Sequence, residues 1–320
     1  MIQTHASNSH PTVSVVIPTY NTSRYISDAI DSVLAQTFRD FEVIVIDDGS
    51  TDNTRQVLEP YRHQIVYILQ ENQGVAAARN RAIQQALGEF VALLDADDQW
   101  LPDKLEKQLA FLRSQPEVSL LFGDAEMFSA TGPVPPSLLA RRDFRCQLTE
   151  RPFIVSDAFH LLLDENFIPT STVIVRKTYL DQVGGFDLDL PPVEDRDMWL
   201  RFAHKFPIAC ISNVLARKRT HDSNISSDKK QRMISLIKVL EKTYANNPSS
   251  VPRHKKRLAS LYFDLGYKDY WLGNYRDASR SFSKSMCLEF QGKAFLYYLV
   301  SLCGKAGASE VSRIKHLCKK

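Results

Sequence analysis

The sequence predicts an α/β protein with a mostly parallel sheet that carries helices on both faces, followed by an α-helical extension. Three observations lead to this fold class. Short runs rich in β-branched residues alternate with segments of helical spacing over the first 125 residues. These runs are apolar throughout, as expected of strands buried on both faces. From Lys229 onward the pattern is helical, so we expect two domains, residues 1–228 and 229–320.

Periodicity places each element of the first domain in turn. Residues 13–19 (VSVVIPT) are a continuous apolar run, and residues 26–36 then carry apolar side chains at helical spacing. The same alternation continues along the chain. Further strands are expected at 41–47, 65–69, 90–95 and 118–122, and further helices at 51–58, 75–87 and 102–113.

The pattern breaks between residues 129 and 151, where three prolines and no periodicity predict a long loop. Regular elements are expected again beyond it. These are a strand at 171–175, a helix at 177–183 that stops at Gly184-Gly185, a helix at 194–204, and short strands at 207–211 and 214–218.

Composition narrows the class of protein. The 320 residues are 44% hydrophobic and 24% charged, which is ordinary for a globular protein, and the net charge of +3 is too small to indicate nucleic-acid binding. Residues 251–320 hold fourteen Lys and Arg against five Asp and Glu. This basic excess is either a solvated face or a contact for anionic lipid or an acidic substrate.

The cysteines and the N-terminus indicate a cytoplasmic enzyme. Five scattered cysteines without a C-x-x-C pair are typical of reduced thiols. The first residues lack the features of a signal peptide, and there is no apolar run of about twenty residues. Peripheral contact with the cytoplasmic membrane face through the basic C-terminal region is the alternative that the charge pattern leaves open.

Polar residues follow three of the expected strands. Tyr20-Asn21 follows the first strand, residues 47–50 follow the second, and an apolar run ends in Asp95, Asp97 and Asp98. Asp95 and Asp97 project to the same side of an extended chain. Two hard oxygen ligands at the carboxyl end of a parallel strand suit Mg²⁺ or Mn²⁺ and hence a diphosphate, although a solvated turn is the commoner use of such a sequence.

Several motifs in this order resemble those of family 2 glycosyltransferases. They are residues 14–21 (SVVIPTYN), 43–52 (VIVIDDGSTD), 72–80 (NQGVAAARN), 93–98 (LLDADD), 184–187 (GGFD), 194–201 (EDRDMWLR), 220–221 (TH) and 224–226 (NIS). The resemblance covers residues 13–227. It implies a Rossmann-like GT-A fold, a nucleotide-sugar donor, in the first place a UDP-sugar, and Mn²⁺ or Mg²⁺ as cofactor.

The resemblance also implies nucleotide-binding residues, namely Pro18, Thr19, Tyr20, Asp48, Arg79 and Asp95. Asp48 would accept hydrogen bonds from the base or ribose; its alternative is to cap a helix starting at Thr51. Tyr20 would pack against the base, or else be a half-buried core residue. Arg79 would contact the diphosphate or base, or else form a structural ion pair.

Asp97 is the expected metal ligand, with His221 as a ligand from the far side of the site and Asp95 contacting ribose or metal. The ion would neutralise the charge that grows on the departing diphosphate. Asp98 is expected to cap the helix after Leu101.

The resemblance implies that Asp195 is the catalytic base, because the family's base matches this position, and a carboxylate near a helix start in a cleft can accept the proton of the acceptor hydroxyl. Its neighbours Glu194 and Asp197 are the alternatives, since the helix N-terminus stabilises any of these anions. Gly185, Glu194 and Trp199 are expected near the acceptor or donor sugar. A helix C-cap at Gly184-Gly185 and a core position for Trp199 are the structural alternatives.

The C-terminal region carries a weaker, tetratricopeptide-like spacing, given by Ala259, Tyr262, Leu265, Gly266, Gly273, Tyr275, Ala278 and Phe282. It predicts a helical hairpin with another helix from Lys293 onward. Phe290 stands where that pattern has proline, so a generic helical appendage is an equal alternative.

Together these features predict a metal-dependent glycosyltransferase that moves a sugar, with inversion, onto a hydroxyl of a glycan acceptor in surface polysaccharide or glycoconjugate synthesis. The acceptor is expected on a lipid carrier, with a protein acceptor as the alternative. A non-catalytic scaffold would be expected to lose the carboxylates, and a nucleotidyltransferase to carry a glycine-rich loop near the N-terminus. Asp48, Asp95, Asp97 and Asp195 are all present, and residues 18–21 (PTYN) are no such loop.

Overall fold

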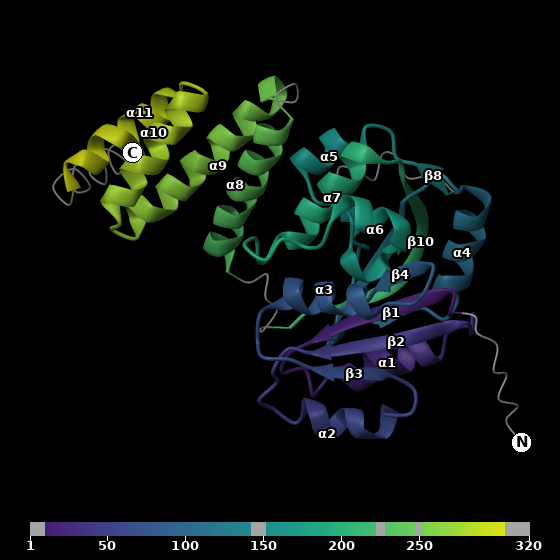
Figure 1. The fold of residues 1–320 in the computed structure, drawn as a ribbon. Helices are drawn as coiled ribbons and strands as arrows, with labels where there is room; N and C mark the ends of the chain where they lie inside the picture. Colours follow the sequence, from purple (N-terminus) through teal and green to yellow (C-terminus); the bar gives the residue numbers. More distant parts are fainter. Residues whose placement is uncertain (1–9, 142–151, 222–227, 248–250, 305–320) are drawn as a thin grey trace, which may run out of the picture. The chain divides into compact units, whose positions relative to one another are not determined.

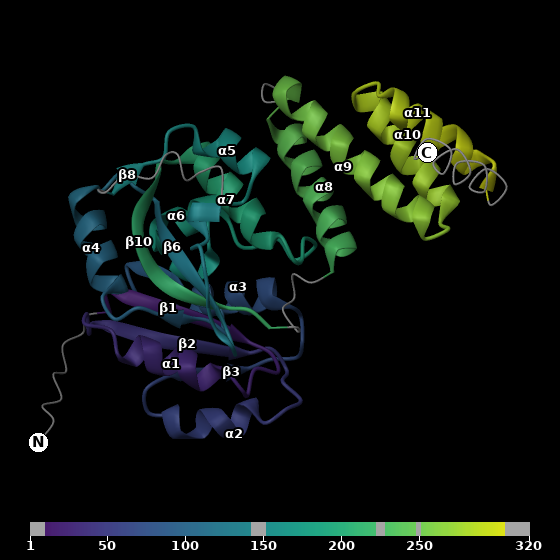
Figure 2. The same ribbon diagram turned by 180° about the vertical axis from the view of Figure 1, so that it is seen from behind.

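The computed structural model describes residues 10–141, 152–221, 228–247 and 251–304 (Figures 1 and 2). The chain divides into two compact units, Met1–Asn224 and Ile225–Lys320. Part of the expected loop (142–151), the motif at 224–226 and residues 248–250 lie outside the described residues.

The first unit is built on one sheet with the strand order β3-β2-β1-β4-β9-β6-β10-β5. Its first half is parallel, as expected. It consists of β1 (Val13–Thr19), β2 (Phe41–Asp47), β3 (Val66–Leu69) and β4 (Phe90–Leu93). Because these strands are parallel, the residues that follow β1, β2 and β4 lie along the same edge of the sheet.

The second half of the sheet is mixed. The strand β9 (Ile174–Arg176) lies antiparallel between β4 and β6 (Leu120–Ser129). The strand β10 (Ile208–Arg219) then runs parallel to β6 and antiparallel to β5 (Gln99–Trp100). Two short strands, β7 (Gly132–Val134) and β8 (Phe153–Ile154), pair with β6 and β10.

Three local expectations need correction. Residues 170–172 form a 3₁₀ turn, so the strand expected at 171–175 begins at Ile174. The two short strands expected at 207–218 are one strand, β10, whose register shifts between Ile211 and Val214. The expected loop contains β7 and a 3₁₀ turn, Leu139–Arg141. Only the long strand β10 is decided by pairing with distant strands, whereas β7 pairs with β6, its neighbour in the chain.

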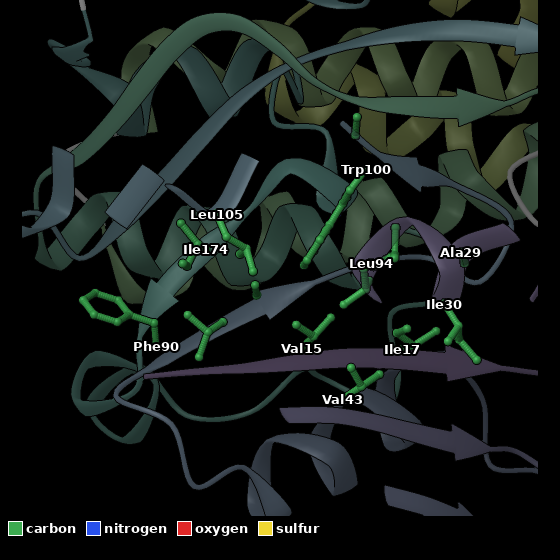
Figure 3. Packing of buried hydrophobic residues seen from close by; sticks show 14 of the residues in the cluster. Val15, Ile17, Ala29, Ile30, Val43, Phe90, Leu94, Trp100, Leu105 and Ile174 are labelled. Atoms are coloured by element: carbon green, nitrogen blue, oxygen red, sulfur yellow. The ribbon is translucent and has the colours of Figure 1, made fainter. Parts of the chain in front are cut away.

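Seven helices among the described residues flank the sheet: α1 (Ile26–Leu34), α2 (Thr54–Leu58), α3 (Val75–Gln85), α4 (Lys104–Ser114), α5 (Ala158–Asp164), α6 (Lys177–Val183) and α7 (Glu194–Lys205). The main core contains Val15 and Ile17 of β1 together with Ile30 of α1 and Leu105 of α4 (Figure 3). The small-residue helix α3 packs on β1 and β2. The predicted α/β fold class with helices on both faces is confirmed.

The second unit is α-helical, as predicted. It contains α8 (Lys229–Asn246), α9 (Val251–Trp271), α10 (Tyr275–Leu288) and α11 (Gly292–Leu302). Tyr270, Phe282 and Tyr297 form the centre of its core. Gly266 permits the close approach of α9 and α10, because a Cβ atom there would lie 3.0 Å from the ring of Phe282. In the part of the chain that the structure describes, no helix combines the length and hydrophobicity that crossing a membrane requires.

Candidate active site

Tyr20 is displayed by a turn that side-chain hydrogen bonds hold in place. The backbone N–H of Asn21 donates to Ser50 Oγ at 2.9 Å, and the N–H of Thr51 donates to Asn21 Oδ1 at 2.8 Å. These bonds tie the loop after β1 to the loop after β2. Pro18 and Thr19 are buried in β1, whereas Tyr20 is 47% exposed. The core alternative for Tyr20 is therefore wrong, and its ring is accessible to a planar base.

Asp48 is 3% exposed and holds the loop that leads into α3. Its Oδ1 accepts hydrogen bonds from Gln70 Nε2 at 2.7 Å and from the N–H of Gln73 at 2.9 Å, and its Oδ2 accepts one from the N–H of Gly74 at 2.8 Å. Helix capping, its alternative, is wrong, because Asp52 Oδ1 accepts from the first residue of α2, Thr54. The nucleotide contact of Asp48 stays a prediction.

Arg79 forms a buried double ion pair. Its Nη2 lies 2.7 Å from Asp95 Oδ1 and its Nη1 lies 2.7 Å from Glu194 Oε1. Burial acts to lower the pKa of the guanidinium, but the two carboxylates outweigh it and raise that pKa. The arrangement matches the structural ion pair considered for Arg79. The burial of Glu194 and its bond to Arg79 argue against the expected contact of this side chain with a sugar.

Burial and the neighbouring cations shift the pKa values of Glu194 and Asp95 in opposite directions. Burial raises the pKa of Glu194 more than Arg79 lowers it, so that pKa lies above its usual value. Burial also acts to raise the pKa of Asp95, but Arg79 and Lys218 bring it below its usual value. Asp95 therefore carries its negative charge beside the arginine.

Asp97 and His221 meet at the end of β10. Asp97 Oδ2 lies 2.9 Å from His221 Nε2, and both side chains are partly exposed. The ring of Tyr25 stacks on that of His221, with 4.9 Å between the ring centroids. Arg219 Nε donates to the carbonyl oxygen of Asp97 at 3.0 Å, and its guanidinium lies over Tyr25. Neither Tyr25 nor Arg219 was expected from the sequence, because neither stands in an informative pattern.

The pair fits a divalent cation. Mg²⁺ takes six ligands at about 2.0–2.1 Å in an octahedron, so adjacent ligand atoms lie about 2.9 Å apart. This equals the separation of Asp97 Oδ2 and His221 Nε2. Over the described residues no group of three His, Cys, Asp or Glu side chains suited to a metal ion is found. As observed, the two side chains are hydrogen-bonded to each other, and they would supply two of the ligands that such an ion needs.

Asp98 does not cap a helix, contrary to expectation. The hydroxyl of Ser171 donates to its Oδ2 at 2.6 Å, and the N–H of Arg219 donates to its Oδ1 at 2.9 Å. Burial raises the pKa of Asp98 to about 7. Asp98 thus connects the end of β10 to the acidic run, residues 95–98. Its partners Ser171 and Arg219 lie 73 and 121 residues away in the sequence.

Lys218 is a further cation that the sequence analysis missed. It is half-buried on β10, one residue before Arg219. Burial acts to lower the pKa of its ammonium group, but the carboxylates of Asp98, Asp95, Asp97 and Asp195 raise it. The lysine therefore stays protonated within the electrostatic reach of all four acids.

Asp195 differs from the other two acids in the first turn of α7. Glu194 pairs with Arg79, and Asp197, also buried, accepts from Arg201 Nε at 2.8 Å. Asp195 is partly exposed, and its Oδ2 accepts from two neutral groups at 3.2 Å, Asn166 Nδ2 and Thr170 Oγ1. Accessibility therefore favours Asp195 over its neighbours as the base.

Gly185 and Trp199 pack against Asn80 and Phe186, respectively. A Cβ atom on Gly185 would lie 2.7 Å from Asn80 Oδ1, and this oxygen accepts the N–H of Phe186. Gly184, with φ of 83°, ends α6, as the C-cap alternative proposed. Trp199 is 1% exposed and meets Phe186 edge to face. This burial matches its core alternative and argues against direct contact with a sugar.

Comparison with known proteins gives a consistent result. The family model described as glycosyl transferase family 2 matches residues 14–168. The chain is 31% identical over 259 residues to the Escherichia coli UDP-Glc:alpha-D-GlcNAc-diphosphoundecaprenol beta-1,3-glucosyltransferase WfgD, covering 80% of this chain and 91% of that protein. It spans between 31% and 44% of the length of several other curated relatives, which are longer proteins.

Two solved structures share the fold. S. aureus TarS 1-349 in complex with UDP matches with a TM-score of 0.62 at 23% identity, over 91% of this chain and 90% of that one. The Pyrobaculum calidifontis mannosyltransferase PcManGT, in complex with GDP-Man and Mn²⁺, matches with a TM-score of 0.56 at 18% identity, over 95% and 84%. At these identities the likeness concerns the fold alone.

Proposed function

The chain belongs to glycosyl transferase family 2, and from this premise we propose that it transfers a sugar from a nucleoside diphosphate sugar to a hydroxyl of a glycan acceptor, with inversion. One observation carries the proposal. Arg79 pairs at 2.7 Å with Asp95 and at 2.7 Å with Glu194, the residue directly before Asp195. The expected base and the expected metal-binding run therefore belong to one site. We assign the transfer to residues 1–228 and treat residues 229–320 as an extension.

A UDP-sugar is the donor we propose. The relative WfgD is named for UDP-Glc, and the TarS structure holds UDP. PcManGT holds GDP-Man instead, so the choice of nucleotide needs a direct test. In this chain Tyr20 would stack on the base, because its ring is exposed at the end of β1.

Asp97 and His221 would hold Mn²⁺ or Mg²⁺, for which their 2.9 Å separation is suitable. When bound, the ion supplies positive charge next to the diphosphate leaving group. Lys218 contributes a second positive charge near the same carboxylates. Both positive charges would stabilise the negative charge that develops on the diphosphate as it departs.

Asp195 accepts the proton of the acceptor hydroxyl as its oxygen attacks the anomeric carbon. Asn166 and Thr170 hold the carboxylate of Asp195 by hydrogen bonds to Oδ2. Attack from the face opposite the diphosphate gives inversion. The base and the charges that receive the leaving group must therefore lie on opposite sides of the sugar.

We propose a lipid-linked glycan in cell-surface polysaccharide synthesis as the acceptor. WfgD is named for a diphosphoundecaprenol-linked acceptor, and it is the relative whose length the chain covers to 91%. The Lys and Arg excess in residues 251–320 would suit contact with an anionic membrane surface. A protein acceptor is the alternative, to be separated from a lipid-linked one by an acceptor assay.

Calorimetric titration of the purified chain with UDP, GDP, CDP and dTDP, each with and without Mn²⁺, tests the proposal. We expect UDP to bind, and to bind more tightly with Mn²⁺. The variant His221→Ala should lose the effect of Mn²⁺. His204→Ala is its matched control, because it removes an imidazole from the last turn of α7, at the opposite end of that helix from Asp195. If none of the four nucleotides binds, the transferase assignment fails and a non-catalytic role gains support.

A further inference from the structure

Arg79 links two segments that lie far apart in the sequence. It stands on α3, whereas Asp95 follows β4 and Glu194 begins α7, 115 residues after Arg79. One terminal nitrogen of the guanidinium reaches each carboxylate at 2.7 Å. The guanidinium also lies over the ring of Phe186, 5.3 Å from its centroid. Four segments of the chain thus meet at one arginine.

The position of Arg79 leaves it little to offer a substrate. The residue is 5% exposed, and both of its terminal nitrogens already contact carboxylates. Its remaining donor, Nε, is also buried and has no protein partner. A nucleotide or diphosphate would have to displace one of two charge-assisted hydrogen bonds to bind it. Such bonds are stronger than neutral ones, so displacement is costly.

The two carboxylates adjoin the residues assigned to chemistry. Asp95 precedes Asp97 by two residues, and Glu194 directly precedes Asp195. A displacement of either carboxylate would move the neighbouring functional side chain. A guanidinium is planar and presents its donors in a rigid fork, so it fixes both the separation and the orientation of two carboxylates.

We propose that Arg79 is a positioning residue for the transfer reaction: by bridging Asp95 and Glu194 it holds Asp195 at a fixed place relative to the donor diphosphate. This inference rests on the proposed function. It differs from the direct nucleotide or diphosphate contact that the sequence suggests for Arg79. The two roles predict different kinetics, because a positioning residue acts on kcat and a nucleotide contact acts on donor binding.

Three variants test the inference. Arg79→Lys keeps the charge but can pair well with one carboxylate only, Arg79→Met removes the charge, and Glu194→Gln keeps the shape while weakening one arm of the bridge. Arg176→Met is the matched control, because Arg176 pairs with Glu89 at the opposite end of β4. Glu194→Gln is informative even if Arg79→Met fails to fold.

We expect kcat to fall by roughly 10- to 100-fold in Glu194→Gln and Arg79→Met, the range for a displacement of about 1 Å at a reacting group. Arg79→Lys should recover part of the loss. The Kd for UDP with Mn²⁺ and the KM for donor should stay at the wild-type values, and Arg176→Met should match the wild type. A raised Kd and KM with normal kcat would overturn the inference in favour of a nucleotide contact.

Hydrogen exchange separates failure of this inference from failure of the proposed function. The backbone N–H of Asp197 bonds to the carbonyl of Val193 in the first turn of α7. We expect exchange there to accelerate in Glu194→Gln and Arg79→Lys, whether or not the wild type turns over any donor. Unchanged exchange together with unchanged kcat would refute a positioning role. An inactive wild type with faster exchange in the variants would refute only the transferase assignment.

Discussion

His221 Nε2 lies 2.9 Å from Asp97 Oδ2 although 124 residues separate them in the chain. The strand β10 makes this contact, because it passes antiparallel to β5 and ends beside the acidic run. Tyr25 and Arg219 then hold the two partners from behind, the first by stacking on His221 and the second by binding the backbone of Asp97. Other side chains of the protein therefore contact both members of the pair.

Loss of either partner should weaken metal-dependent donor binding. For His221→Ala and Asp97→Asn we expect the affinity for Mn²⁺ in the presence of UDP to fall by at least about 10- to 100-fold, the range seen when mere supporting residues of a metal site are lost. Electron paramagnetic resonance of free Mn²⁺ during titration measures this. Unchanged Mn²⁺ affinity in both variants would exclude the pair as ligands.

Asp195→Asn should abolish transfer while donor affinity is retained. Removal of a general base costs roughly 10²- to 10⁴-fold in rate. The amide keeps the shape of the side chain and its place beside Asn166 and Thr170. Turnover of labelled donor and calorimetry with UDP measure the two effects, with the exposed Asp189→Asn as control. Normal turnover in Asp195→Asn would transfer the role to another group.

Tyr20 should contribute to nucleotide binding through its ring. Stacking of a base on an aromatic side chain contributes about 1–3 kcal/mol. Tyr20→Ala should therefore raise the Kd for UDP, whereas Tyr20→Phe should bind as the wild type does. Because the side chain is 47% exposed, neither change should lower thermal stability appreciably. Equal affinities of the Ala and Phe variants would show that the ring is not a base platform.

Lys104 should make stability depend on pH. It is fully buried, donates to Gln108 Oε1 at 2.7 Å and lies over the ring of Trp100, and burial lowers its pKa well below 10.5. Between the two pKa values, Lys104 is therefore protonated in the unfolded chain and neutral in the folded chain. Above pH 10.5 Lys104 is neutral in both states and costs no stability. As pH falls from 10.5 toward the folded-state pKa, the free energy of unfolding decreases.

The variant Lys104→Met lacks this dependence and should be more stable than the wild type near neutral pH. Its advantage should shrink as pH rises toward 10.5, by at most about 1.4 kcal/mol per pH unit. Urea unfolding at several pH values measures the difference, with Lys107→Met as the exposed control. A constant difference across that range would mean that Lys104 is charged in the folded protein.

Phe282→Ala should destabilise the helical unit. The side chain is fully buried and packs against Gly266 and Tyr297. Truncation of a buried phenylalanine costs about 3–5 kcal/mol. Phe290→Ala, at a residue that is 73% exposed, should change stability by less than about 0.5 kcal/mol. Chemical unfolding followed by circular dichroism distinguishes them, and equal effects would contradict the observed core.

Much of the architecture followed from local pattern. The bounds of β1 and β2 agree with the expected strands, and α6 agrees with the expected helix, because continuous apolar runs and helical spacing are properties of neighbouring residues. The parallel half of the sheet followed from the alternation of these elements. The antiparallel insertion of β9 did not, since three residues carry no signal of where they pair.

The sequence by itself determined which chemical groups stand after the strands of the sheet, and the tertiary structure decided how they are used. Asp97 and His221 were expected at one site, and an ion pair was the alternative for Arg79. The burial of Glu194 and Asp48 and the identity of the two partners of Arg79 were not expected. The physical reason is that a buried charge must be paired. Its partner is chosen by which distant segments pack together, so the partners of Arg79 and Arg219 are set by the fold.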